Sequence, residues 1–279
     1  MTIGTRPMPK RVRLESLATN ALVVLMCLFF IFPILWMVLA ALKTPLQIAD
    51  PSQTFIFSPT LDNFFRVATE NEFGQYIWNS SVIAVAATLI SLILGVPAAY
   101  VISRYSMNKS NIWILAARVV PGISLLVPWY YFAASLGLVG TYSGLILCHL
   151  FVTLPMVVWI MTGFFDGIPQ ELEEAGLVDG LGPAKVFLRI IMPLSTPGIA
   201  TAALLAVIFS WNNFLFSLVL ADNDTRTMPV ALYNFVSYAS IDWGGLMAAS
   251  TICMAPVVAF ALVAERWLVS GLTAGAVKG

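Results

Sequence analysis

The sequence has few charged residues, one histidine and three cysteines. Charged residues make up 10% of the 279 residues, whereas soluble domains average roughly a quarter. The formal net charge is zero, so no basic or acidic excess points to a nucleic-acid partner or to an acidic soluble substrate. These scarcities exclude the ordinary soluble classes.

The cysteines and the histidine give no sign of a catalytic or metal site. Cys27, Cys148 and Cys253 all lie in apolar runs and are odd in number, so we expect neither a disulfide framework nor a metal centre. His149 lies next to Cys148 with no second ligand in evidence. A hydrogen-bonded packing role is favoured over metal or acid/base chemistry, and we expect no enzymatic activity from this chain.

A phosphate-binding loop is also missing. The motif G-x-x-x-x-G-K-[ST] needs Gly before Lys, but Lys43-Thr44 follows Leu42 and Lys109-Ser110 follows Asn108. The chain is therefore expected to bind no nucleotide cofactor by this motif, and any energy from ATP must come from another subunit.

Apolar residues dominate what is present. Hydrophobic residues make up 59% of the chain, and the mean hydropathy is +0.90. Each apolar run can cross a hydrocarbon core of about 30 Å as a helix and is too long for a barrel strand. The first run lacks an evident A-x-A cleavage site, so it is expected to be a retained span. The sequence predicts an all-α integral membrane protein with six transmembrane helices, at residues 18–42, 76–102, 111–134, 142–165, 196–221 and 243–269.

The polar segments divide the chain further. We expect an N-terminal segment over 1–17, an external segment over 43–75, a core domain over 76–269 and a C-terminal tail over 270–279. With the N-terminus inside, the outer side receives only Lys43, Arg66 and Arg226. The positive-inside rule therefore places both termini in the cytoplasm. The basic residues on the inner side would be Arg6, Lys10, Arg11, Arg13, Arg104, Lys109, Lys185, Arg189, Arg266 and Lys278.

Prolines interrupt five of the six expected spans. Static kinking, which membrane helices tolerate, is the simpler interpretation, and hinging during transport is the alternative. No internal repeat is evident, so the two-halves design of many secondary carriers is not indicated. The prolines are Pro33, Pro97, Pro121, Pro128, Pro155 and Pro256.

The stretch 168–197 is the longest polar interruption in the second half of the chain. Pro169 suits the start of a helix, and Glu171, Glu173 and Glu174 would lie in its first turns, where acidic side chains complement the positive helix end. Gly180 suits a left-handed stop. A second helix would run from Pro183 to Pro193, where proline ends it. One face of this helix would carry Val186, Phe187, Ile190 and Ile191, and the other would carry Lys185 and Arg189.

A family resemblance enters at this stretch. Glu174-Ala175-Gly176, Asp179-Gly180, Phe187, Ile190 and Pro193 resemble the "EAA" loop of permease subunits of binding-protein-dependent ABC importers. Gly176 stands where that family usually has a second alanine, and Met192 where it usually has leucine.

The resemblance implies how the loop works. Residues 168–193 would form a cytoplasmic coupling loop between helices 4 and 5 of a type I permease fold, docked on the ATPase subunit. Glu174 would contact the ATPase, Ala175 and Gly176 would allow close approach, and Asp179 with Gly180 would fix the turn. The alternative is a solvated amphipathic loop on the membrane surface.

More distant motifs resemble the carbohydrate branch, and within it the shorter permease of maltose-type importers. In that branch the tail reaches the ATPase, which would assign contacts to Gly275, Lys278 and Gly279; a frayed terminus is the alternative. Asn213 departs from the family, which often has an acid there. The matching residues are Asn79-Ser80, Ala98-Ala99-Tyr100, Arg118 with Pro121, Gly137-Leu138 with Thr141, Trp211-Asn212 with Phe214, and the tail 271–279.

The substrate path is less sharply indicated. Trp211, Asn212 and Asn213 lie in the fifth expected span, where they would either join helices or offer a ring face and amides to a sugar. Arg118 would either snorkel to the inner interface or contact a gate. An interfacial aromatic belt explains Trp129, Tyr130 and Tyr131.

The expected function is a permease subunit of an ABC importer for a sugar, oligosaccharide or polyol. The resemblance implies a second permease, two ATP-binding subunits holding ATP and magnesium, and an extracytoplasmic solute-binding protein, in a bacterial or archaeal cytoplasmic membrane. The alternative cargo is glycerol 3-phosphate or another non-sugar solute. Three other classes are a gradient-driven carrier, a membrane-embedded enzyme and a signalling scaffold. A gradient-driven carrier would need an acidic residue inside the membrane.

Overall fold

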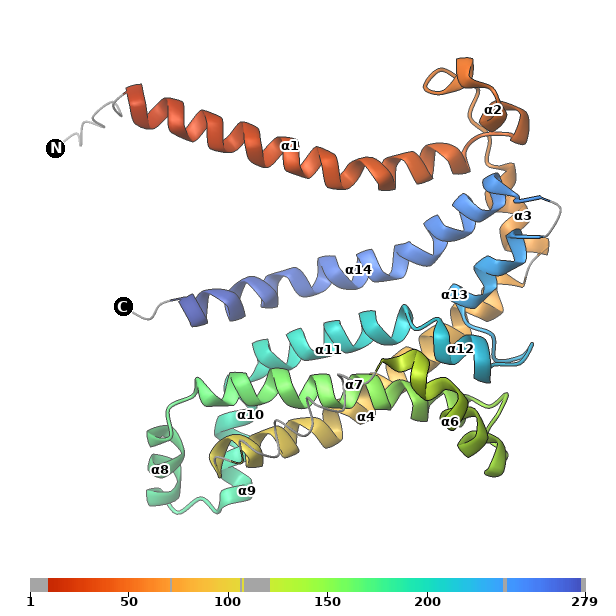
Figure 1. Ribbon diagram of the computed structural model, residues 1–279. Coiled ribbons are helices and arrows are strands. Elements are labelled where there is room, and N and C mark those ends of the chain that lie inside the picture. The colour runs from red at the N-terminus through yellow and green to blue at the C-terminus, as the bar shows by residue number, and fades with distance from the viewer. Residues whose placement is uncertain (1–9, 71, 106, 108–120, 238–239, 277–279) are drawn as a thin grey trace.

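The computed structural model describes residues 10–70, 72–105, 107, 121–237 and 240–276, which are almost entirely helical (Figure 1). Four described helices are long and apolar enough to cross a membrane: α1 (Lys10–Ala41), α4 (Phe73–Arg104), α7 (Tyr142–Asp166) and α14 (Trp243–Ala276). They confirm four of the six predicted spans as continuous helices, each with a proline inside it. The third predicted span is described only from Pro121 onward, as α6 (Gly122–Ser135).

The fifth predicted span is broken, so the expectation of one helix over 196–221 is wrong. α11 (Thr196–Trp211) ends at Trp211, and α12 (Leu215–Leu220) begins a few residues later. The Asn212 amide donates to the carbonyl oxygen of Ile208 at 2.9 Å, and the Asn213 side-chain oxygen accepts from the backbone N–H of Phe216 at 3.3 Å. Asparagine side chains that bond the backbone compete with helical hydrogen bonding, which explains the break.

Small side chains let α4 and α7 pack closely. Adding a Cβ atom to Gly95 of α4 would bring it within 2.9 Å of Val157 Cγ1 on α7. The hydroxyls of Ser91 and Thr153 share a buried hydrogen bond of 2.7 Å between the same helices. Interfaces between membrane helices favour such small residues because the backbones can then approach. The buried small residues along this face of α4 are Ser80, Ala84, Ala87, Ser91, Gly95 and Ala99.

A sharp bend joins α11 to the helices before it. α9 (Pro183–Val186), a π-helical turn (Phe187–Ile191) and α10 (Met192–Leu194) form one arm, which meets α11 at 73°. Pro193 does not end this arm, as the sequence suggested, but lies inside α10. The arm ends at Ser195, whose hydroxyl donates to the carbonyl oxygen of Ile191 at 2.7 Å.

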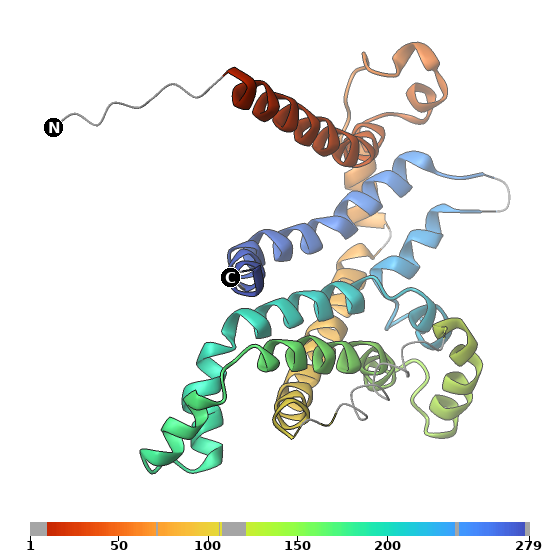
Figure 2. The ribbon, with the colours of Figure 1, turned by 60° about the vertical axis from the view of Figure 1, so that its left-hand side comes forward.

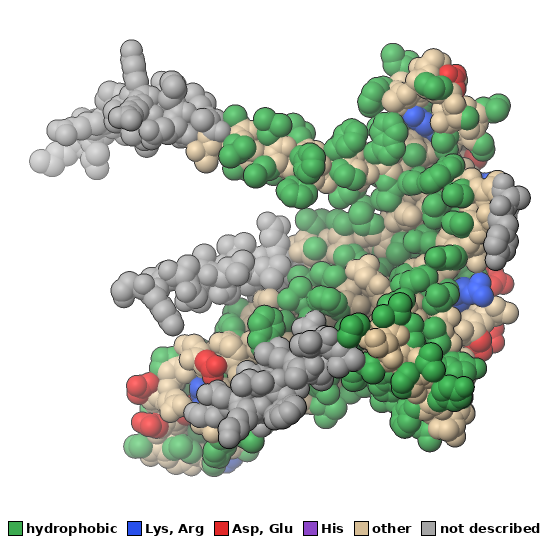
Figure 3. All heavy atoms as spheres, in the orientation of Figure 1, with side chains coloured by type: hydrophobic (Ala, Val, Ile, Leu, Met, Phe, Trp, Pro, Cys, Tyr) green, Lys and Arg blue, Asp and Glu red, His purple; other side chains and the backbone are tan. Residues whose placement is uncertain are grey.

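The two ends of the molecule differ in character. The beginning of α1, the end of α14 and the helices α8 (Glu171–Val178) and α9 lie at one end (Figures 1 and 2). The other end holds α2 (Pro45–Ala49), α3 (Asp62–Glu70), α12 and α13 (Met228–Ala231). In the space-filling view, side chains of Asp, Glu, Lys and Arg gather near these two ends and hydrophobic side chains cover the surface between them (Figure 3). This distribution is the one a membrane-spanning bundle requires, while the orientation of the termini stays a prediction.

Candidate functional site

The candidate site is the loop between α7 and α11, and its first helix is α8. The N–H of Leu181 donates to the Gly176 carbonyl and the N–H of Gly180 to the Leu177 carbonyl, both at 3.0 Å. With Gly180 at φ +83°, this pattern is a Schellman stop, and it confirms the predicted left-handed position of Gly180. Asp179 is the C-cap of the helix and directly precedes Gly180, while the role of its side chain in the turn stays a prediction.

The loop has two arms: α8 is the first, and the helical segment from α9 to α10 is the second. Gly176 is the contact point between them. It is buried, and a Cβ atom there would come within 2.6 Å of Ile190 Cδ1 and 3.2 Å of Val186 Cγ2. The absence of a side chain at this position lets the two arms touch. Gly176 permits this close packing at a cost in helix propensity of about 0.5–1 kcal/mol relative to alanine.

The second arm faces inward as its sequence pattern predicts. Val186 and Ile191 are buried, whereas Lys185 and Arg189 are exposed. The ring of Phe187 lies 4.8 Å from the ring of Tyr100 on α4, centroid to centroid. The loop is thus packed against the spans on one side and open on the other.

Glu174 and Ala175 lie on the open side. Both are exposed, and the Glu174 carboxylate has no hydrogen bond or ion pair to any other residue that the structure describes. This pair of residues is free to contact a second protein.

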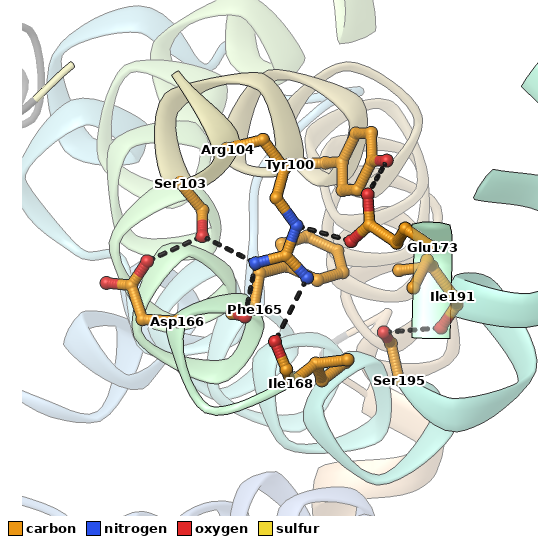
Figure 4. Close-up of polar contacts among 9 residues, drawn as sticks. All are labelled: Tyr100, Ser103, Arg104, Phe165, Asp166, Ile168, Glu173, Ile191 and Ser195. Atoms are coloured by element: carbon orange, nitrogen blue, oxygen red, sulfur yellow. Dashed lines mark hydrogen bonds and ion pairs between the residues drawn. The ribbon is translucent and has the colours of Figure 1, made fainter. Parts of the chain in front are cut away.

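A polar cluster, which we call the Arg104 cluster, ties the loop to the ends of α4 and α7. It consists of Tyr100, Ser103, Arg104, Asp166 and Glu173 (Figure 4). The guanidinium of Arg104 pairs with the Glu173 carboxylate, and the Tyr100 hydroxyl donates to the same carboxylate at 2.5 Å. Ser103 donates to Asp166 at 2.5 Å.

The same guanidinium also binds the end of α7. Arg104 donates to the carbonyl oxygen of Phe165 at 2.9 Å and to that of Ile168 at 3.3 Å. The side chains of Arg104 and Glu173 are only 10% and 13% exposed. The sequence alone indicates Arg104 only as a basic residue on the inner side and Glu173 only as an acid near the start of a helix. The available signal was the i,i+4 spacing of Tyr100 and Arg104, which places both on one face of α4.

The structure describes three of the four residues suggested for a substrate path, and it gives them different degrees of burial. Trp211 is buried, and its Nε1 donates to the carbonyl oxygen of Cys253 on α14 at 3.1 Å. Asn212 is exposed and Asn213 is partly buried. None of them reaches the Arg104 cluster. Arg118, Lys278 and Gly279 lie outside the described residues, and Gly275 falls in the last turn of α14.

His149 links three helices inside the bundle. Its Nδ1 lies 2.7 Å from Ser210 Oγ of α11, and its Nε2 lies 3.4 Å from Ser217 Oγ of α12. The ring therefore joins α7 to both sides of the α11–α12 break. Across the described part of the chain, no three His, Cys, Asp or Glu side chains gather where they could hold a metal ion.

Trp129 also packs inside the bundle, in edge-to-face contact with Phe151 and Phe216. Tyr130 and Tyr131 next to it are exposed, by 41% and 70%. The two tyrosines fit the predicted aromatic belt better than Trp129 does.

Known proteins are similar to this chain along nearly its whole length. It is 36% identical over 269 residues to the trehalose/maltose transport system permease protein MalG of Thermococcus litoralis, covering 92% of this chain and 94% of that protein. It is 34% identical over 257 residues to the trehalose transport system permease protein SugB of Mycobacterium tuberculosis, covering 90% and 93%.

The fold matches that of a solved transporter. A chain from the crystal structure of a bacterial ABC transporter involved in the import of the acidic polysaccharide alginate superposes with a TM-score of 0.77 at 19% identity, covering 95% of this chain and 100% of that one. Residues 91–274, which include the whole loop and the break after Trp211, match the family described as "Binding-protein-dependent transport system inner membrane component". The chain therefore belongs to this family of membrane permeases.

Proposed function

We propose that this chain is the permease subunit of an ABC importer that carries a carbohydrate across a bacterial or archaeal cytoplasmic membrane. Relatives that act on trehalose, on trehalose and maltose, and on diacetylchitobiose support a carbohydrate cargo. ATP and magnesium would be bound by a separate subunit. The role of this chain would be movement rather than covalent chemistry.

The exposed end of α8 carries the proposal. Glu174 and Ala175 project from a helix that Gly176 seats against the second arm and that Glu173 ties to α4. A partner pressing on Glu174 and Ala175 would therefore push on the spans and not only on a flexible loop. The bundle would have two arrangements, and the closed, ATP-bound ATPase pair would bind the loop more tightly in one of them. ATP-driven closure would therefore shift the bundle toward that arrangement.

The exposed surface of α1 supports the proposal that this chain works with partners. The most apolar window of α1, within Thr19–Ala41, is not buried at all inside the chain, so this helix needs lipid or a second permease around it. We propose a heterodimer with a second permease, a pair of ATP-binding subunits and an external solute-binding protein. Both termini would be cytoplasmic, and Gly275, Lys278 and Gly279 would contact the ATPase.

The other cargoes and classes find less support. A gradient-driven carrier would need an acid within its spans. In the described apolar spans Thr19–Ala41, Phe73–Arg104, Tyr142–Asp166 and Trp243–Val263, however, the acidic residue is Asp166, which is the last residue of α7. Glycerol 3-phosphate would favour basic side chains in mid-membrane, and the one basic residue in these spans is Arg104 at the end of α4. Within this proposal, Asn212 is a better candidate for sugar contact than Trp211, because the indole N–H of Trp211 is already used.

The test places one crosslinker at the docking surface. An Ala175→Cys variant is purified from its native membrane with the proteins that accompany it and is treated with a short bifunctional crosslinker. We expect the label on a nucleotide-binding subunit and ATP-driven uptake of labelled trehalose by vesicles that hold the complex. If no nucleotide-binding subunit is ever recovered on the introduced thiol from a complex that transports sugar, the proposed function is wrong.

A further inference from the structure

Two adjacent glutamates of α8 face opposite ways. Glu174 is exposed and has no partner among the described residues, whereas Glu173 turns inward to Arg104 and Tyr100 (Figure 4). One position along a helix corresponds to a rotation of about 100°, which is enough to separate an outward surface from an inward one. The surface that would meet the ATPase and the contact that reaches the spans are therefore different residues.

Three elements meet at the Arg104 side chain. Arg104 is the last residue of α4, pairs with Glu173 of α8 and donates to the carbonyls of Phe165 and Ile168, in the last turn of α7 and just beyond it. Each of these contacts uses a different guanidinium nitrogen. A planar guanidinium with all its nitrogens engaged fixes the directions of its partners as well as their distance.

Aromatic packing supports the same connection. Tyr100 donates to Glu173, and its ring lies 4.8 Å from Phe187 and 5.6 Å from Phe165, centroid to centroid. The Tyr100 side chain thus contacts both arms of the loop and the end of α7. Polar and apolar contacts at this place tie the loop to the same two spans.

We propose that Arg104 and Glu173 are positioning residues that make α8 move together with the inner ends of α4 and α7, so that a displacement imposed at Glu174 reaches the membrane spans. The inference rests on the proposed function and adds to it the residues that transmit the movement. Separating a largely buried ion pair would leave both charges uncompensated, so the pair resists separation while the loop is pushed. Without the ion pair, α8 would still dock on the ATPase, but its displacement would deform the loop and would not reach the spans.

The decisive variant is Glu173→Gln, which removes the charge and keeps the side-chain size. The matched control is Glu171→Gln, because Glu171 lies in the same first turn, is exposed and has no partner in the described structure. Tyr100→Phe removes a single hydroxyl donor from the cluster and serves as a milder second variant. Each variant is made in the complete complex with its partner permease, ATPase pair and binding protein.

Two measurements separate transmission from folding. The first is labelled trehalose taken up per ATP hydrolysed in vesicles. The second is the distance distribution between spin labels at Val178→Cys on α8 and Tyr105→Cys at the end of α4, with and without ATP and magnesium, in a chain whose native cysteines are replaced by alanine. Val178 and Tyr105 are 87% and 76% exposed, so labels there disturb little packing.

We expect the label distance to stay the same on ATP addition in the unsubstituted chain and in Glu171→Gln, and to shift or broaden in Glu173→Gln. Uptake per ATP should fall about fivefold or more in Glu173→Gln, the range of a typical coupling between two sites, and less in Tyr100→Phe. A merely structural role would lower the amount of complex and would leave this ratio unchanged.

Glu173→Gln with an unchanged ratio and an unchanged distance distribution would overturn the inference, and so would an equal loss in Glu171→Gln. Failure of the unsubstituted complex to contain an ATPase would instead overturn the proposed function. If that complex does not carry trehalose, the cargo assignment fails, and the spin-label distances still decide the role of the pair.

Discussion

The indole Nε1 of Trp211 donates a hydrogen bond of 3.1 Å to the carbonyl oxygen of Cys253, joining the last residue of α11 to α14. Trp211 is 2% exposed, whereas the next residue, Asn212, is exposed. A structural residue and a surface residue thus stand side by side at the break between α11 and α12. Substitutions of Trp211 and Asn212 should therefore affect different properties of the protein.

Trp211→Phe should lower the free energy of unfolding by about 1 kcal/mol, because it leaves the Cys253 carbonyl without this donor. Asn212→Ala should leave stability almost unchanged and alter sugar uptake. Thermal unfolding in detergent, together with uptake of labelled trehalose, distinguishes the two. Unchanged unfolding with altered uptake in Trp211→Phe would assign this tryptophan to the path instead.

Glu174→Lys should abolish most transport while the chain still inserts and folds, because its reversed charge lies on the exposed side of α8. Glu171→Lys is the control, with the same charge change in the same turn. The measurements are the amount of the chain in the membrane and the amount of ATPase that copurifies with it. Normal uptake by Glu174→Lys at a normal membrane level would disprove the docking role of Glu174.

Gly144→Ala should destabilise the chain by about 1–3 kcal/mol, the usual cost of overpacking. A Cβ atom on Gly144 would lie 2.2 Å from the backbone carbonyl oxygen of Leu138, which cannot move aside as a flexible side chain could. Gly163→Ala on the same helix is the control, since nothing lies within 4 Å of its added methyl group. Alanine is the better helix former, so Gly163→Ala should unfold at the same temperature or a higher one. Equal unfolding temperatures for the two variants would contradict the packing at Gly144.

His149→Leu should lower the free energy of unfolding by about 1–3 kcal/mol, because it leaves the buried hydroxyls of Ser210 and Ser217 without the ring nitrogens. His149→Gln should lose less, since its amide can still bond to one of the hydroxyls. Thermal unfolding of both variants, with uptake per ATP as a second measurement, checks the packing role. An unchanged unfolding temperature with lost uptake in both variants would indicate that His149 acts in transport and not in stability.

Local signals predicted most of the loop between α7 and α11. Gly180 stops α8 because its left-handed conformation suits glycine, and Pro183 opens the second arm because its fixed φ suits a first helical position. Pro193 was assigned a helix end that the structure places at Ser195. The π-helical turn before it, in which the N–H of Met192 donates to the Phe187 carbonyl, is not indicated by composition.

Long-range contacts were not predictable from the same signals. Arg104 and Glu173 are 69 residues apart in sequence, so their pairing depends on how α4, α7 and α8 are placed in space. The sequence did not predict that α11 ends at Trp211, because the apolar run continues on both sides of Asn212 and Asn213. A hydropathy pattern averages over two such residues, whereas the backbone responds to each amide separately.

The close approach of α4 and α7 at Gly95 limits how this permease can change shape. A small shift along either helix would bring the Val157 and Leu154 side chains of α7 into steric clash with the α4 backbone, because Gly95 has no side chain to separate them from it. We therefore expect the two helices to move together as one rigid unit. We therefore expect any alternation between inward and outward access to bend the chain outside this contact, for example at the 73° corner at Ser195 or in the gap between Trp211 and Leu215.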